Sequence, residues 1–123
     1  MRISKYGHSH MANDGQQTIL CGALMSQGEI RFPPPEFLIG DETATPVPLS
    51  PIGQLYTYTT VHPGKAPAYS LAMVDFDHGL RIFGRLLLGE APPALGSNVR
   101  VVPFTLSEGE IDFAFEPVEE DAA

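Results

Sequence analysis

Two stretches of this chain decide its fold: residues 53–86, GQLYTYTTVHPGKAPAYSLAMVDFDHGLRIFGRL, and residues 96–104, GSNVRVVPF. Residues 54–62 and 69–77 are rich in β-branched and aromatic side chains, which favours extended strands. A Pro/Gly loop at 63–67 separates them. Asp77, His78 and Gly79 predict a tight turn in which Gly79 supplies the positive φ. The two stretches therefore predict consecutive antiparallel strands.

Alternation along these strands assigns side chains to faces. In the first strand one face is predicted to carry Leu55, Thr57, Thr59 and Val61, and the other Tyr56, Tyr58, Thr60 and His62. In the second strand the faces are Ser70, Ala72, Val74 and Phe76 against Tyr69, Leu71, Met73 and Asp75. Both faces of the second strand are largely apolar, so we expect it to be a central or barrel-lining strand.

Three further strands complete the predicted domain. Residues 80–87 form the third, in which Gly84 predicts a bulge or a sharp bend. Residues 98–105 form the fourth, and Pro103 fits an edge or a strand end because it has no N–H donor. Residues 110–116 form the fifth, with Ile111, Phe113 and Phe115 expected to point inward. Five short strands with a glycine kink indicate an all-β protein, a five-stranded OB-fold barrel.

The flanking segments lack this regularity. Residues 1–16 have no periodicity and are predicted to be flexible. In residues 17–32, the runs 18–20 and 30–32 are predicted to pair as a hairpin around Gly28, and residues 33–52 form a proline-rich linker. The barrel is expected over residues 53–116 and an acidic tail over 117–123.

Composition limits the classes of function. The 123-residue chain has a formal net charge of −8, which repels a phosphate backbone, so we expect no nucleic-acid partner. Charged residues make up only 18%, which suggests that part of the surface is covered by another protein. One cysteine excludes an internal disulfide, and no apolar run is long enough to span a membrane, so a cytoplasmic location is expected.

The order of several motifs resembles the family of OB-fold proteins associated with acyl-CoA. The motifs are Gly53–His62, Ala66–Tyr69, the run Val74–Asp77 with Gly79 and Arg81–Gly84, Gly96 with Val99 and Val101, and, upstream, Gly28 with Phe32–Pro34. Such proteins carry a rubredoxin-like zinc ribbon before the barrel. This resemblance implies an OB-fold with a short ribbon-like N-terminal extension over residues 17–52.

This chain departs from the family at the zinc ligands. The first cysteine pair of the family falls near Leu24 and Gln27, and the second near Leu38 and Asp41. A structural zinc site needs about four nitrogen or sulfur ligands, so we predict a degenerate ribbon without metal. We expect Leu24, Phe37 and Leu38 to replace the metal by a small apolar contact.

The resemblance implies a non-catalytic accessory subunit. Members of the family are similar to subunits that bind thiolase-superfamily enzymes and help position acyl-CoA for acyl transfer, thiolysis or aldol cleavage. By this comparison the partner supplies the catalytic groups, no cofactor is bound by this chain itself, and coenzyme A of the partner's substrate contacts it. The residues expected to contact the partner or CoA are Tyr56, Tyr58, His62, Lys65, Tyr69, Arg81, Phe83 and Arg85.

Two alternatives remain from the residues themselves. The aromatic residues of the barrel would suit a module that binds single-stranded nucleic acid. His62 beside Asp75 or Asp77 would suit general acid–base chemistry in a free-standing acyl-CoA enzyme. Cys21 has no base placed near it in sequence, and a buried apolar role is expected for it.

Overall fold

The computed structural model describes residues 2–3, 11–15, 17–35, 37–89, 91–105, 109 and 111–118. The expectations of a flexible segment over residues 4–10 and of an acidic tail over 119–123 lie outside this part of the chain.

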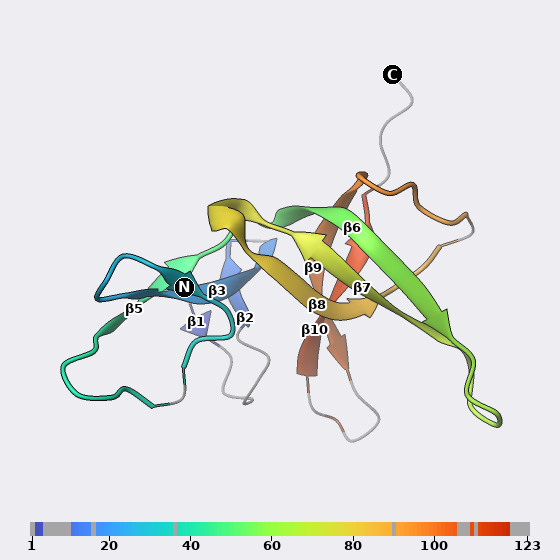
Figure 1. The fold of residues 1–123 in the computed structure, drawn as a ribbon. Helices are drawn as coiled ribbons and strands as arrows, with labels where there is room; N and C mark the ends of the chain where they lie inside the picture. The colour runs from blue at the N-terminus through green and yellow to red at the C-terminus, as the bar shows by residue number, and fades with distance from the viewer. Residues whose placement is uncertain are drawn as a thin grey trace.

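The chain forms an N-terminal lobe and a barrel that lie side by side (Figure 1). The lobe strands are β1 (Arg2–Ile3), β2 (Met11–Asp14), β3 (Gln17–Met25), β4 (Ile30–Arg31) and β5 (Ala44–Pro48). The barrel strands are β6 (Ile52–Val61), β7 (Tyr69–Asp75), β8 (Arg81–Leu86), β9 (Asn98–Thr105) and β10 (Ile111–Pro117).

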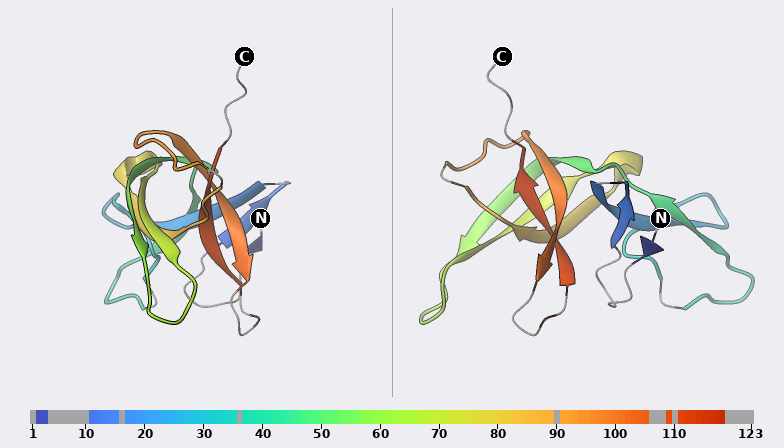
Figure 2. Two further views of the ribbon diagram at one scale, coloured as in Figure 1. Left: turned by 90° about the vertical axis from the view of Figure 1, so that its right-hand side faces the viewer. Right: turned by 180° about the vertical axis from the view of Figure 1, so that it is seen from behind.

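The barrel closes in the order β10-β8-β7-β6-β9. All neighbours are antiparallel except β10 and β8, which pair in parallel through Ala114 with Arg85 and Phe115 with Leu86. Seen along its axis in the left panel of Figure 2, the strands surround a single interior. This topology confirms the predicted five-stranded OB-fold. The segment between β7 and β8 is one 3-10 turn, η2 (Asp77–Gly79), where His78 has φ 62° in addition to the positive φ expected at Gly79.

The barrel core consists of the inward side chains of all five strands. Its fully buried members include Leu55, Val74, Val99 and Phe115. A bulge between Leu55 and Thr57 interrupts the pairing of β6 with β7. The predicted alternation holds for Tyr56, which faces solvent, and is wrong from Thr57 on, because the bulge leaves Thr57 on the solvent side as well and packs Tyr58 against the core.

Glycine is required at position 84 for a different reason from the one predicted. β7 and β8 pair without a register shift from Ser70–Leu86 to Asp75–Arg81, so the bulge lies in β6 and not at Gly84. A Cβ at Gly84 would lie 2.8 Å from Phe113 Cε2 and 2.9 Å from Phe115 Cε2. Glycine is needed there because two phenyl rings pack against the backbone.

The last strand also differs in part from the alternation. Phe115 is fully buried and Phe113 packs against the core, as expected. Ile111 is 40% exposed, because β10 has not yet reached its pairing with β8 at that point. Pro103 pairs with Phe113 on the β10 side only, and β9 pairs with β6 no further than Arg100, so no neighbour needs the missing N–H.

The lobe is more regular than the sequence predicted. β3 is one long strand, and its hairpin with β4 pairs Ala23 with Arg31 and Leu24 with Ile30, not residues 18–20 with 30–32. Three strands were missed altogether, among them β1, which pairs with β2 inside residues 1–16. β2 pairs with β3 within a segment expected to be flexible, and β5 pairs with Cys21–Met25 of β3 within the expected linker.

The lobe and the barrel share one hydrophobic core. Met11, Leu20 and Leu49 from the lobe side are buried in the same cluster as the barrel residues Leu55 and Val74. A hydrogen bond reinforces this junction, since Ser50 N, just after the lobe, donates to Asp77 Oδ1 beside β7 at 3.2 Å. The lobe therefore packs onto the barrel through this shared core and adds a small buried cluster of its own, formed by Ala12, Ile19 and Cys21. Among the described residues, no helix is long and apolar enough to cross a membrane.

Candidate functional site

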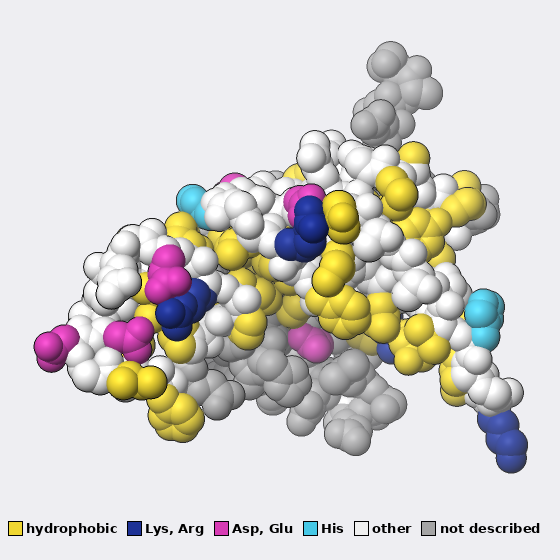
Figure 3. Space-filling model, viewed as in Figure 1, with side chains coloured by type: hydrophobic (Ala, Val, Ile, Leu, Met, Phe, Trp, Pro, Cys, Tyr) yellow, Lys and Arg dark blue, Asp and Glu magenta, His cyan; other side chains and the backbone are white. Residues whose placement is uncertain are grey.

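The outer surface of β6, β7 and β8 carries most of the residues singled out in the sequence. Cross-strand pairs place Asp75 beside Arg81, Met73 beside Phe83, and Leu71 beside Arg85. Tyr56 is 48% exposed and Phe83 is 57% exposed, which is unusual for large aromatic side chains on a sheet. Hydrophobic side chains gather over these strands around adjoining basic and acidic groups (Figure 3). We call this set, Tyr56, Leu71, Met73, Asp75, Arg81, Phe83 and Arg85, the outer face.

One end of the outer face is a stacked ion pair. Arg81 Nε donates to Asp75 Oδ1 at 2.6 Å, and Arg81 Nη2 donates to Asp75 Oδ2 at 3.3 Å. The Arg81 guanidinium carbon also lies 3.5 Å from the centre of the Tyr56 ring. The hydrogen bond to Asp75 raises the pKa of Arg81, so this arginine stays charged and is neutralised locally. Tyr56 reaches this cluster because it follows the buried Leu55 and so points to the outer side of β6.

The other end of the outer face holds Arg85 between two aromatic rings. Its guanidinium carbon lies 4.7 Å from the centre of Tyr69 and 5.0 Å from that of Phe104. These distances are typical of cation–π contacts. Within the described part of the chain, no carboxylate forms an ion pair with Arg85. The two aromatic rings therefore hold the Arg85 guanidinium group in place, and its positive charge remains available to bind an anion.

Arg85 lines a groove of about 370 Å³ at the junction of barrel and lobe. Phe32 and Pro33 of the lobe form one side, and the Phe32 ring meets the Phe113 ring edge-on at 5.9 Å. Gly84 also lines the groove, and the Phe113 ring that packs on its backbone is part of the same wall. The remaining lining residues are Leu71, Phe83, Phe104, Asp112 and Phe113. The groove is mostly apolar and carries one cation, Arg85, and one carboxylate, Asp112, whose Oδ1 accepts from Phe113 N at 2.8 Å. It fits a ligand with an apolar body and an anionic group that is bound on the Arg85 side.

The structure gathers some of the predicted site residues and separates others. Tyr56 joins Arg81, and Tyr69 joins Arg85, while Phe83 lies between the two clusters. Tyr58 is half-buried and packs against the core, apart from both clusters. His62 and Lys65 are both exposed in the loop that connects β6 to β7, and this loop lies at the far end of the strands from the stacked ion pair. The contributions of Phe32 and Phe104 were missed, because no local pattern in the sequence places them beside β8.

The pairing of His62 with Asp75 or Asp77 is not formed. Asp75 pairs with Gln54 at the start of β6, whereas His62 follows Val61, which pairs with Tyr69 at the other end. At about 3.3 Å per residue, roughly 20–25 Å of strand separates them. Asp77 instead lies near His78, with Nε2 and Oδ2 3.6 Å apart. The acid–base pair that motivated the enzyme alternative is therefore excluded by the register of β6 and β7.

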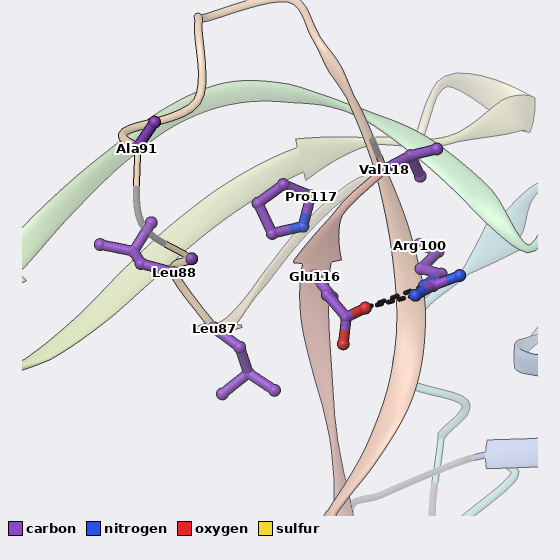
Figure 4. Close-up of a pocket in the computed structure, with 8 residues that line it drawn as sticks. Leu87, Leu88, Ala91, Arg100, Glu116, Pro117 and Val118 are labelled. Carbon is purple, nitrogen blue, oxygen red and sulfur yellow. Dashed lines mark hydrogen bonds and ion pairs between the residues drawn. The ribbon is translucent and has the colours of Figure 1, made fainter. Parts of the chain in front are cut away.

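A second, open hollow of about 1030 Å³ lies at the end of β10 (Figure 4). Arg100 and Glu116 lie side by side in its lining, and Arg100 Nε donates to Glu116 Oε1 at 3.2 Å. Leu87, Leu88, Pro117 and Val118 supply its apolar wall. Because the arginine and the carboxylate neutralise each other, this hollow offers no uncompensated charge to a ligand.

The ribbon positions do not fit a zinc ion. Leu24 and Gln27 stand at the end of β3 and in the turn that follows, and Leu38 and Asp41 stand in the loop before β5. That set offers neither a thiolate nor an imidazole. Among the described residues, no group of three or more His, Cys, Asp or Glu is placed to bind a metal. The prediction that Leu24, Phe37 and Leu38 form an apolar contact in place of the metal is wrong, since Phe37 is 81% exposed and Leu38 is 49% exposed.

Comparison with known proteins agrees with this architecture. Residues 46–103 match the family model described as the C-terminal OB-fold domain of ChsH2. The barrel is an OB-fold domain similar to that of ChsH2. This confirms the resemblance to acyl-CoA-associated OB-fold proteins, and the match covers β6 to β8 and most of β9 but not β10.

A solved structure extends the likeness to the lobe. It is the Ltp2-ChsH2(DUF35) aldolase, which matches with a TM-score of 0.62 at 22% sequence identity. The match covers 80% of this chain and 84% of that chain. At this identity the comparison establishes the shared fold. A comparison with curated proteins finds no match.

Proposed function

We propose that this chain is a non-catalytic accessory subunit of a thiolase-superfamily enzyme. In a hetero-oligomer with that enzyme, it would help to position acyl-CoA for carbon–carbon bond formation or cleavage. The observation that carries the proposal is the ChsH2-type barrel with its exposed outer face. The matching structure is named as an aldolase of Ltp2 and ChsH2 together. That pairing supports a partner enzyme for this chain too.

The outer face supplies the surface for such a partner. Tyr56, Met73 and Phe83 expose apolar surface to water, and covering this surface with a partner protein would be favourable. Aromatic side chains and arginine are enriched at the centres of protein interfaces. The stacked Tyr56–Arg81–Asp75 cluster is fixed before binding, which lowers the entropy lost on association.

The groove beside this face supports contact with coenzyme A. Its apolar lining suits a pantetheine chain, and Arg85 is oriented to bind a phosphate or carboxylate oxygen. The partner would supply the nucleophile and the bases.

Co-expression tests the proposal. The chain is produced with a thiolase-superfamily enzyme from the same genome, and co-elution and acyl-CoA turnover are measured. We expect a stable complex and a gain in turnover over the enzyme alone. Independent elution with unchanged turnover would contradict the proposal.

Two variants separate binding of the partner from contact with CoA. Phe83→Asp places a charge on the exposed apolar surface and should abolish co-elution. Arg85→Gln should preserve co-elution but raise KM for acyl-CoA about tenfold, because a charge-assisted hydrogen bond is lost. Arg100→Gln is the matched control, since Arg100 is a surface arginine already paired with Glu116. An equal effect of Arg85→Gln and Arg100→Gln would remove the assigned role of Arg85.

A nucleic-acid-binding module is the second candidate. The observation in its favour is that exposed aromatics and arginines lie on the strand face that OB-folds use for oligonucleotides. Against it stand the net charge of −8 and the neutralisation of Arg81 by Asp75. Titration with a single-stranded oligonucleotide at physiological salt decides between the two, and micromolar binding would favour this second candidate.

A further inference from the structure

The loop between β4 and β5 presents three consecutive large apolar side chains to solvent. Phe37, Leu38 and Ile39 are 81%, 49% and 79% exposed. Hydrophobic side chains project from this edge of the lobe beside acidic ones (Figure 3). Single exposed apolar residues are common on protein surfaces, but a contiguous group is typical of an interaction site. We call residues 37–39 the apolar loop.

The apolar loop is held by its own hydrogen bonds. Ile39 N donates to Glu42 Oε1 at 3.0 Å, and Glu42 N donates to Ile39 O at 3.2 Å. Gly40 allows this turn with φ 63°. No thiolate or imidazole stands in residues 37–42, so the turn is built without the ligands of a structural zinc. A turn fixed in this way presents its side chains to a partner at a reduced entropic cost.

The charges around the loop restrict what it can meet. Asp41 is exposed and Glu42 is half-buried beside it. The one nearby cation among the described residues, Arg31, is already paired with Glu29 at 2.9 Å, and the chain as a whole carries a charge of −8. An anionic lipid surface would repel this rim, whereas a protein pocket lined with basic residues would attract it. Charge complementarity therefore favours a protein pocket over a membrane.

We propose that the apolar loop inserts into an apolar pocket with a basic rim on a partner protein. This inference rests on the proposed function, in that the pocket belongs to the thiolase-superfamily enzyme. The loop is a second contact, separate from the outer face of the barrel. Phe37 and Ile39 are the anchors, and Asp41 faces the basic rim of the pocket.

The test measures the affinity of the complete chain for that enzyme by titration. The double variant Phe37→Ala/Ile39→Ala should weaken the Kd by about tenfold or more, because truncating anchor side chains has effects of this size. Leu95→Ala is the matched control, since Leu95 is 64% exposed in a different loop and should leave Kd unchanged. Asp41→Lys should weaken binding at low salt and lose this effect at high salt. Thermal unfolding should be the same for all variants, because every substituted side chain is exposed.

Each other outcome overturns the inference in a distinguishable way. If the wild-type chain binds and the double variant binds equally well, the apolar loop has no docking role while the proposed function stands. If the wild-type chain binds no such enzyme, the proposed function fails and this inference fails with it. If phosphatidylserine vesicles retain the wild-type chain but not the double variant, the loop meets a lipid surface instead.

Discussion

The barrel and the N-terminal lobe use different means to reach a stable β-structure. The barrel strands are bounded by glycines, prolines or polar turns, and the five strands close upon themselves. Most lobe strands are short, and β5 contains Pro46 and Pro48, which cannot donate to a neighbouring strand. The difference shows that the barrel is specified locally, whereas the lobe depends on what it packs against.

The dependence of the lobe on the barrel is visible in the core. Met11, Leu20 and Leu49 are buried with barrel residues in a single cluster. A ribbon that held zinc would gain folding energy from the metal itself. The described residues of this lobe offer no suitable set of metal ligands. The shared hydrophobic core therefore stabilises the lobe where a zinc ion would otherwise do so.

Leu20→Ala should destabilise the whole chain. Leu20 is fully buried in the shared core, and truncating such a side chain costs about 2–5 kcal/mol. Urea denaturation followed by circular dichroism should show one transition that moves to lower urea, as it should for Leu55→Ala in the barrel. If Leu20→Ala instead produces two transitions and leaves the second unmoved, the lobe and the barrel are independent units.

Gly84→Ala should destabilise the barrel by about 1–3 kcal/mol through overpacking. The new Cβ would lie 2.8 Å from the ring of Phe113 and 2.9 Å from that of Phe115. Gly64→Ala is the matched control, because a Cβ there meets no heavy atom within 4 Å. The free energies of unfolding of the two variants give the comparison. Equal values would show that the rings move aside at no cost.

Cys21 should give the unfolding free energy a small dependence on alkaline pH. Burial raises the pKa of its thiol, so the folded chain holds this proton more tightly than the unfolded chain. The resulting stabilisation is complete below the thiol pKa of the unfolded chain, which is about 9, and is lost as the pH rises through the folded pKa. The difference between wild type and Cys21→Ala should therefore shrink above that pH. A constant difference would contradict the assignment.

A metal chelator should have no effect on stability. The ribbon positions Leu24, Gln27, Leu38 and Asp41 supply no zinc ligand set, so the unfolding midpoint should be unchanged by EDTA. Mass spectrometry of the native chain checks the same point. About one zinc per chain, as a structural site requires, would contradict the account.

The sequence predicted the barrel well because its signals are local. The fourth strand was predicted over residues 98–105, where β9 lies, and the turn at Gly79 was expected. The bulge at Tyr56 was missed, because nothing in a Tyr-Thr-Tyr-Thr run marks which residue is extra. β5 was missed because two prolines suggest a linker, although a strand paired on one side tolerates them.

The candidate site was predicted by residue type but not by arrangement. Tyr56, Tyr69, Arg81, Phe83 and Arg85 were identified from the sequence, and they share the outer surface of β6–β8. Their pairing into two clusters depends on the register between the strands. The groove also needs Phe32 and Phe104, which come from distant parts of the chain. Contacts between such segments follow from the closed fold and not from spacing.

The most direct test of the central claim is a binding titration between this chain and a thiolase-superfamily enzyme from the same genome. If the chain is an accessory subunit, we expect a complex that is stable in size-exclusion chromatography. The substitution Phe83→Asp should abolish this complex, whereas the Arg100→Gln variant should bind like the wild type. The account would be contradicted if the wild-type chain and the enzyme elute separately at micromolar concentration, or if Phe83→Asp binds as tightly as the wild type.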